Sequence, residues 1–345
     1  MLSLSDRLAG CLLGQAAGDA LGFVVEGAPP EAAAEYVDRW LRAGRRTERA
    51  HPHFSVGQYS DDTQLARELL LAFQEAGGFD CAAYAARIAE LFRRGRDVGA
   101  GPGTRGAAQR LIAGVPWREV ATPPPYAGNG SAMRAAPIGL LARGDPEALG
   151  RMAREQSAIT HASPECAAGA VAIAGAVALA SRAGPLAHGE FLESLAGWVG
   201  PVDRGLAVAI LGLERWGARE PPRAMEHLLR AGLDPGAGGT WRGVPGSVVP
   251  SVLWSLYAFL RSPDDYWETV CTAIRAGGDT DTTAALAGAM AGARLGPGAV
   301  PVDLAGVLHD RGEWRAADLE RLARACGALL AAGAPRASGG VSGPA

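Results

Sequence analysis

Small, helix-forming residues fill the stretch from Ala284 to Ala293, and a stretch near the N-terminus has a similar character. The N-terminal stretch opens on a capping-box pattern, Ser3-x-x-Asp6, and continues with apolar residues at helical spacing. It also carries glycines that are typical of closely packed helices, at Gly10, Gly14 and Gly18. Alternating runs of β-branched residues are nearly absent. We therefore expect an all-α fold in which many helices pack through alanine and glycine.

The chain has 345 residues, which is longer than most single domains, but large helical enzymes reach this length as one unit. No linker-like break occurs before the last dozen residues, which are rich in glycine, proline and serine. We expect one compact domain over 1–333 and a disordered tail over 334–345. Besides the N-terminal helix and one near 104–112, helices are expected at about 31–42, 63–76, 80–94, 165–183, 203–216, 223–231, 248–260, 264–276, 281–294, 302–309 and 318–332.

Two clusters of carboxylates and hydroxyls, far apart in the sequence, each precede a helical pattern. One is Asp279-Thr280-Asp281-Thr282, which follows two glycines, and the other is Ser60-Asp61-Asp62-Thr63. Such residues are favoured at helix starts, so capping alone is one interpretation. However, adjacent carboxylates repel each other unless water or a cation lies between them, and their oxygens are the ligands that Mg²⁺, Mn²⁺ and Ca²⁺ prefer. Two such clusters favour a metal site over capping.

Two turns and one histidine are candidates for binding an anionic ligand. The glycine-rich stretch from Gly95 to Thr104 leads into a helical pattern, where backbone N–H groups suit a phosphate, although a plain turn is the simpler interpretation. The segment from Asn129 to Arg134 offers amides, a methionine and a cation, or else it is a helix entry with Arg134 on the surface. His161 stands at a helix start, where the positive helix end lowers its proton affinity, so we expect a neutral imidazole.

Composition excludes several classes of function. The net charge of −3 leaves no basic footprint for nucleic acid. No lysine occurs, which excludes lysine Schiff bases and a P-loop lysine. The five cysteines form no Cys-x-x-Cys pair, so we expect reduced core thiols. Because neither a basic-then-apolar leader nor a long apolar run is present, we expect neither secretion nor membrane insertion, and a cytoplasmic protein. We expect a monomer as a separate hypothesis, since the sequence does not fix the oligomeric state or the preferred metal.

Five motifs stand in the order in which they occur in the ADP-ribosylglycohydrolase family, which includes the dinitrogenase-reductase-activating glycohydrolases. They are Gly10–Gly22, Tyr59–Thr63, Gly128–Arg134, Thr160–Ala162 and Gly277–Thr282. The resemblance spans about residues 5–295, and the combination of motifs is highly specific. It implies a compact all-helical enzyme with a centre of two Mg²⁺, or Mn²⁺, that removes ADP-ribose from modified proteins or small molecules.

The resemblance also implies roles for individual residues. The family more often has threonine at position 60, so Ser60 keeps the hydroxyl ligand but is expected to hold one metal more loosely. Glu26 matches a glutamate on the mobile loop that reaches the metals in serine-specific members. On the matching positions, the metal ligands are Ser60, Asp61, Asp62, Asp279, Asp281 and Thr282.

The chemistry of glycoside hydrolysis fits this set of residues. Bound cations acidify a water molecule, and the reaction passes through an oxocarbenium-like state while an acid protonates the leaving group. Asp62 or Glu26 is the candidate acid/base, with Asp61 also in the catalytic set, and the choice between the first two stays open. The two turns would hold the diphosphate, and His161 would bind ribose or phosphate. The expected substrate-binding residues are Gly99, Gly101, Gly103, Asn129, Gly130, Ser131, Met133, Arg134 and His161.

Two other functions stay open at this point. One is a non-catalytic member that binds ADP-ribose or serves structurally, although the chain keeps all four aspartates of the two clusters. The other is a Mg²⁺-dependent phosphoesterase that acts on the pyrophosphate and releases AMP. The linkage that is cleaved, to arginine, serine, a nucleobase or a small metabolite, is not fixed by the sequence, because the residues that contact the leaving group lie in variable loops.

Overall fold

The computed structural model describes residues 2–142, 144–232 and 242–333. Within these ranges the regular structure is helical, no strand occurs, and extended backbone pairs only in isolated bridges such as Val244 with Gly278. The predicted all-α class is confirmed, whereas the predicted tail over 334–345 lies outside the described residues. The helices are α1 Leu4–Phe23, α2 Pro30–Tyr36, η1 Val37–Leu41, α3 Asp61–Ala76, α4 Cys81–Arg93, α5 Pro102–Ile112, η2 Asn129–Ser131, α6 Ile138–Leu141, α7 Pro146–Ser157, α8 Pro164–Ala180, α9 His188–Val199, α10 Arg204–Gly217, α11 Pro221–Leu228, α12 Val248–Arg261, α13 Tyr266–Ile274, α14 Thr280–Leu295, η3 Pro297–Ala299, α15 Val302–Val307 and α16 Ala316–Ala331.

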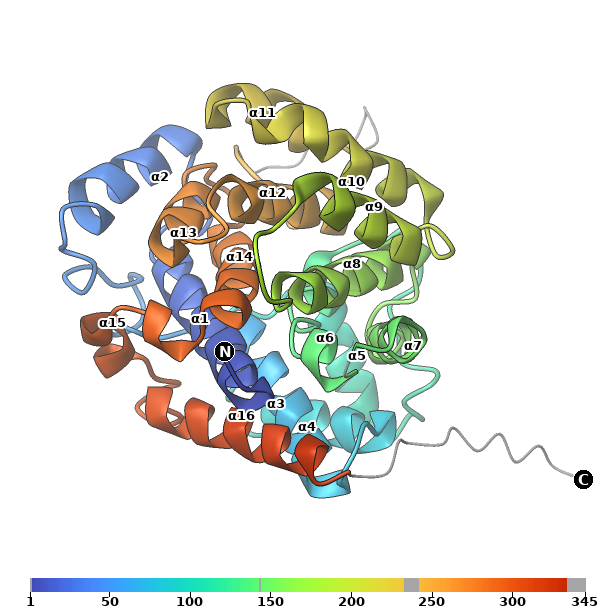
Figure 1. The fold of residues 1–345 in the computed structure, drawn as a ribbon. Helices are drawn as coiled ribbons and strands as arrows, with labels where there is room; N and C mark the ends of the chain where they lie inside the picture. The colour runs from blue at the N-terminus through green and yellow to red at the C-terminus, as the bar shows by residue number, and fades with distance from the viewer. Residues whose placement is uncertain (1, 143, 233–241, 334–345) are drawn as a thin grey trace, which may run out of the picture.

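Helices α1 and α14 pack against each other at the centre of the molecule (Figure 1). Every residue of α14 from Thr280 to Ala293 is buried. A Cβ atom added at Gly14 would lie 2.3 Å from the carbonyl oxygen of Gly288, and one added at Gly18 would lie 2.1 Å from that of Ala284. The two backbones therefore touch directly, which residues with side chains would prevent. The expected close packing of small residues is confirmed at this crossing.

The ends of the central helices place the polar motifs at one end of the bundle. The hydroxyl of Thr280, at the start of α14, donates to the carbonyl oxygen of Gly22, at the end of α1, over 2.8 Å. The start of α3 lies beside the same region, because Asp19 of α1 accepts from the backbone N–H of Ser60. Three chain segments that are distant in sequence thus meet where α1 ends and α3 and α14 begin.

The outer helices complete the core. Figure 1 shows α16 along one side of the central pair and α9 to α11 along the opposite side. The helices α6, α7 and α9 were not predicted, although α7 and α9 have apolar residues at helical spacing, such as Leu149 and Met152 in α7. All five cysteines are free and buried, as predicted. None of the described helices combines the length and apolar character that crossing a bilayer requires.

Candidate active site

A cavity of about 520 Å³ lies at the end of the bundle where the polar motifs meet. Its walls come from the loop after α1, the starts of α3, α5 and α14, the turn η2 and the segment before α12. The cavity is within the size range of small-molecule sites, and it is unusually acidic. Its lining residues are Glu26, Asp61, Asp62, Gly99, Ala100, Gly101, Pro102, Thr104, Tyr126, Asn129, Gly130, Met133, His161, Pro245, Gly246, Ser247, Asp279, Asp281 and Thr282.

Five carboxylates from three chain segments face this cavity: Glu26, Asp61, Asp62, Asp279 and Asp281. The two sequence clusters are in direct contact, because the Thr282 hydroxyl donates to Oδ2 of Asp62 over 3.3 Å. The Ser60 hydroxyl lies 3.1 Å from the same Oδ2 atom and also accepts from the backbone N–H of Asp62. Ser60 therefore caps α3, so the capping interpretation holds for this residue. At Asp279 no side-chain cap bond forms.

Burial and mutual repulsion disfavour ionisation of these groups. Burial, followed by the charges of neighbouring carboxylates, raises the pKa of Asp61, Asp62 and Asp281 well above the ordinary value of an aspartate. Burial and the charges of Asp279 and Asp19 raise the pKa of Glu26 to about 7. Strongly perturbed carboxyl groups that share a cavity are a feature of functional sites, since such packing costs stability unless something offsets the repulsion.

Two buried oxygen atoms of this cluster, Oδ2 of Asp61 and Oδ1 of Asp62, have no hydrogen-bond partner in the described part of the chain. An unpartnered buried carboxylate oxygen is costly, and a bound cation would remove that cost. In the described ranges, no three His, Cys, Asp or Glu side chains are grouped so that they could hold a metal ion as they stand. The expected ligand set differs in using the hydroxyls of Ser60 and Thr282 as well. The residue types and the two free oxygen atoms fit a hard divalent cation.

Asp19 is a buried acid that the list of expected site residues lacks. Its carboxylate accepts from the backbone N–H groups of Ser60 and Thr63 and from the Thr63 hydroxyl, over 2.8, 3.0 and 2.6 Å. Burial raises its pKa to about 6, against the effect of these bonds. Asp19 therefore fixes the turn that presents Asp61 and Asp62. In the sequence, Asp19 stands between Gly18 and Gly22, in a helix whose glycines indicate close packing. That position could have predicted a buried polar contact for Asp19 instead of a solvated side chain.

The glycine-rich loop is held in place by Gln64 of α3. The Gln64 side chain accepts from the N–H of Val98 and donates to the carbonyl oxygen of Arg96, over 3.0 and 2.9 Å. The N–H of Asp61 in turn donates to the carbonyl oxygen of Val98 over 2.7 Å. Gly99, with φ +83°, and Gly101 line the cavity, whereas Gly103 packs against Tyr126 behind it. The loop thus places backbone beside the carboxylates, at the start of α5.

The segment Asn129–Arg134 contributes only part of what was expected. Asn129 lines the cavity and donates to Oδ2 of Asp279 over 2.6 Å, and Gly130 and Met133 also line it. Ser131 instead donates to a backbone carbonyl, and it is not among the lining residues. Arg134 is completely buried and is also absent from the lining, so it is neither a surface residue nor a cation facing the cavity.

The guanidinium of Arg134 is occupied inside the protein. It donates to the side chain and backbone of Gln156, to the hydroxyl of Thr160 and to the carbonyl oxygen of Gly130, over 2.7 to 3.1 Å. These contacts tie the turn η2 to the end of α7. Arg134 therefore supports the wall of the cavity from behind.

His161 and Tyr126 form an aromatic corner of the cavity. Their ring centroids lie 5.7 Å apart, and Nδ1 of His161 lies 2.7 Å from the Thr160 hydroxyl. Burial, assisted by the charge of Arg134, lowers the pKa of His161 to about 3. This shift favours the neutral imidazole that the sequence predicted, but its main cause is burial and not the helix end. Tyr126 was not predicted as a site residue. Its position three residues before Asn129 was the available signal.

The comparisons with known proteins agree on one family. The family model for ADP-ribosylglycohydrolase matches residues 1–337. The ADP-ribosylhydrolase ARH3 of Mus musculus is 30% identical over 328 residues, which cover 86% of this chain and 85% of that protein. The ADP-ribosyl-(dinitrogen reductase) glycohydrolase of Rhodospirillum rubrum is 28% identical over 305 residues, or 87% of this chain and 89% of that protein.

One more relative and one solved structure agree with this family. The ADP-ribosylarginine hydrolase Tri1 of Pseudomonas putida is 29% identical over 303 residues, which cover 86% of this chain and 72% of that protein. A solved structure described as an ADP-ribosylglycohydrolase-related protein complex has a TM-score of 0.69 at 28% identity and covers 95% of this chain and 99% of that chain.

Proposed function

The chain belongs to the ADP-ribosylglycohydrolase family and is a glycohydrolase, and from this premise we propose that it releases ADP-ribose from a modified arginine or serine side chain, or from a small molecule, with two Mg²⁺ or Mn²⁺ ions. The observation that carries the proposal is the cavity lined by five carboxylates, two of which have a buried oxygen atom without a hydrogen-bond partner among the described residues. Cytoplasmic location and a monomeric state remain predictions.

In this proposal the cations are held by Ser60, Asp61 and Asp62 at the start of α3 and by Asp279, Asp281 and Thr282 at the start of α14. When bound, such ions supply Lewis acidity toward the ribose hydroxyls and acidify water. The hydrogen bonds from Asn129 to Asp279 and from Thr282 to Asp62 support the arrangement, because they fix the orientations of two of these carboxylates.

Proton transfer is assigned to Glu26 or Asp62. Glu26 lies in the loop after α1, is less deeply buried than the aspartates, and has a pKa raised to about 7, which suits a group that gives a proton to a leaving group and takes it back. Asp62 accepts hydrogen bonds from two hydroxyls, which favour its ionised form, and a bound cation would offset the burial that raises its pKa. This contrast favours Glu26 as the acid/base and Asp62 as a ligand.

The neutral part of the cavity is assigned to the ADP moiety. The loop with Gly99 and Gly101 leads into the N-terminus of α5, where backbone N–H groups favour a diphosphate. Tyr126 offers an aromatic surface for adenine, and neutral His161 offers Nε2 to a ribose hydroxyl or a phosphate oxygen.

The test is chromatography of the products after incubation with arginine- and serine-ADP-ribosylated peptides, with Mg²⁺ and separately with EDTA. Free ADP-ribose that forms only with Mg²⁺ supports the proposal and identifies the linkage. AMP as the product would replace the proposal with pyrophosphate hydrolysis. Release of ADP-ribose in EDTA at the same rate would contradict the role assigned to the cations.

A further inference from the structure

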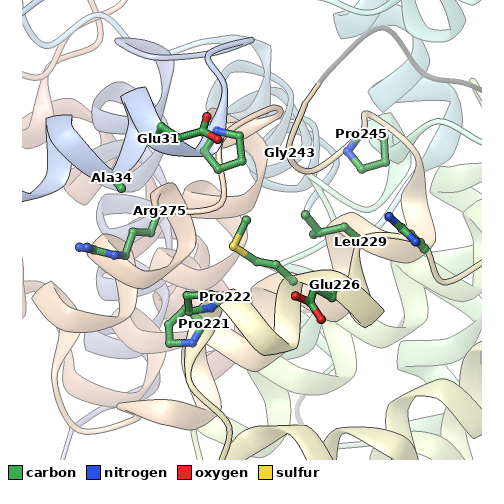
Figure 2. Close-up of a pocket in the computed structure, with 12 residues that line it drawn as sticks. Glu31, Ala34, Pro221, Pro222, Glu226, Leu229, Gly243, Pro245 and Arg275 are labelled. Atoms are coloured by element: carbon green, nitrogen blue, oxygen red, sulfur yellow. The ribbon is translucent and has the colours of Figure 1, made fainter.

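A second cavity, of about 640 Å³, lies outside the proposed catalytic cavity between α2 and α11 (Figure 2). Figure 2 shows Ala34 of α2 on one side, Pro221 at the start of α11 and Leu229 just after its end on another, and Pro245 on a third. The cavity has no cluster of carboxylates comparable to the one described above, so the proposed chemistry does not use it. Its volume exceeds that of the catalytic cavity and matches a few amino-acid side chains.

A hydrogen-bonded segment of backbone lies between the two cavities. Pro245 lines both of them. The backbone next to it is bonded on two sides: the N–H of Val244 donates to Gly277 over 3.0 Å, and the N–H of Asp279 donates to Val244 over 2.9 Å. Gly278 is in turn bonded to Ala28 of the loop that carries Glu26, over 2.8 Å. The backbone between the two cavities therefore consists of the same segments that present the carboxylates.

The lining of the second cavity is mainly apolar. Proline rings, Ala34, Leu229 and half-buried Met225 supply it, and methionine adapts its shape to different apolar partners. Four charged residues line it as well: Glu31 accepts from Arg242 over 2.7 Å, Arg275 donates to both oxygen atoms of Asp38 over 2.7 and 2.9 Å, and Glu226 and Arg230 are exposed. The apolar part of this surface suits an uncharged apolar group.

We infer that this cavity binds an apolar side chain of the polypeptide that carries the ADP-ribose, close in sequence to the modified residue. The inference rests on the proposed function, which places the leaving group next to Glu26. Pro30, a lining residue of the second cavity, is four positions after Glu26, so the Cα atoms of the two lie at most about 14 Å apart. A neighbour two to four positions from the modified residue spans that distance in an extended peptide.

The experiment compares three substrates that share one linkage: the ADP-ribosylated amino acid alone, a peptide with leucine two to four positions from the modified residue, and the same peptide with glycine there. Met225→Ala removes an apolar contact, and Ala34→Trp fills the cavity. Leu211→Ala is the matched control, because Leu211 is an apolar residue that is 44% exposed on α10 and lies outside the cavity. Thermal denaturation checks that each variant is folded.

We expect the wild type to have a KM about tenfold lower for the leucine peptide than for the glycine peptide, the ratio expected for burying one large apolar side chain in part. Met225→Ala and Ala34→Trp should each remove most of that difference in KM, whereas Leu211→Ala should keep it. In all three variants kcat, and the KM for the bare amino acid, should stay at the wild-type value. Equal KM values for the two peptides in the wild type would overturn the inference. So would an increase in KM for the bare amino acid, in Met225→Ala or Ala34→Trp, as large as that for the leucine peptide. A dimer in solution that Ala34→Trp dissociates would assign the cavity to a second copy of the chain instead. Absence of ADP-ribose release from all three substrates would overturn the proposed function itself, and this inference with it.

Discussion

Thr282 donates its hydroxyl hydrogen bond to Asp62 over 3.3 Å, although 220 positions separate them in the sequence. The contact joins the starts of α14 and α3, and these starts also carry Asp279, Asp281 and Asp61 toward the same cavity. Helix N-termini favour negative charge, which lowers the cost of gathering aspartates there. The fold thus assembles an acidic site from two helix starts that the crossing of α1 and α14 holds together.

Replacing one carboxylate of this site should abolish cation binding without unfolding the protein. Asp62→Asn and Asp281→Asn each remove a charge and keep the shape, so we expect Mg²⁺ affinity to fall at least about a hundredfold and turnover to fall with it. In EDTA the variants should melt at or above the wild-type temperature, because the amide removes buried repulsion. Calorimetric titration with Mg²⁺ and thermal denaturation measure both effects. Asp264→Asn, at an exposed carboxylate, is the control. Full turnover in either site variant would refute the dinuclear assignment.

Glu26→Gln should separate proton transfer from cation binding. If Glu26 is the acid/base, the variant should lose about a hundredfold or more in kcat while its Mg²⁺ affinity and its affinity for ADP-ribose stay within a few-fold of wild type. Single-turnover kinetics together with calorimetric titration provide the comparison. A substrate with a leaving group that needs no protonation should restore much of the rate. If Mg²⁺ affinity falls as steeply as in Asp62→Asn, Glu26 is a ligand and the acid/base role passes to Asp62.

The sequence predicted the all-α fold class and the grouping of the two acidic motifs. It predicted less well which other side chains line the cavity. Helical spacing and the small residues of Ala284–Ala293 are local patterns, so the helices they form were readable without tertiary information. The carboxylates could be grouped because charged residues rarely stand in apolar helices without a reason. The helices α7 and α9 were missed even though both carry periodic apolar residues, since their polar faces resemble a loop.

The direction of a side chain at a turn could not be read in the same way. Arg134 stands in a motif of which Asn129, Gly130 and Met133 line the cavity. Its own side chain points into the core, because Gln156 and Thr160 offer it acceptors there. Asp19 and Tyr126 were passed over for the opposite reason, as neither stands in a cluster of polar residues. Which face of a turn meets the ligand depends on the helices behind it, and no local pattern contains that information.

The crossing of α1 and α14 should not tolerate a single added methyl group. A Cβ atom at Gly18 would lie 2.1 Å from the carbonyl oxygen of Ala284, so Gly18→Ala must push two backbones apart. We expect a loss of about 3 kcal/mol or more in the free energy of unfolding, or failure to fold. Gly212→Ala is the matched control within α10, where an added Cβ meets no atom within 4 Å, and it should stabilise the protein by up to about 1 kcal/mol. Urea denaturation measures both, and equal stability of the two variants would contradict the direct backbone contact.

His161 should make the stability of the protein fall on acidification. Burial lowers its pKa from 6.5 to about 3, so between these values the unfolded chain binds a proton that the folded chain does not bind. Protons therefore favour the unfolded state, and the contribution of His161 is complete above pH 6.5 and is lost as the pH falls toward 3. Between pH 7 and pH 5 the loss amounts to about 2 kcal/mol.

His161→Gln removes the titrating group. Between pH 7 and pH 5 the free energy of unfolding of this variant should therefore fall about 2 kcal/mol less than that of the wild type. This comparison of slopes does not depend on the stability that the variant loses at pH 7 through the missing contact with Thr160. His188→Gln, at an exposed histidine at the start of α9, should follow the wild-type profile. Urea denaturation at the two pH values gives both differences, and parallel profiles for wild type and His161→Gln would show that the imidazole is charged in the folded protein at pH 5.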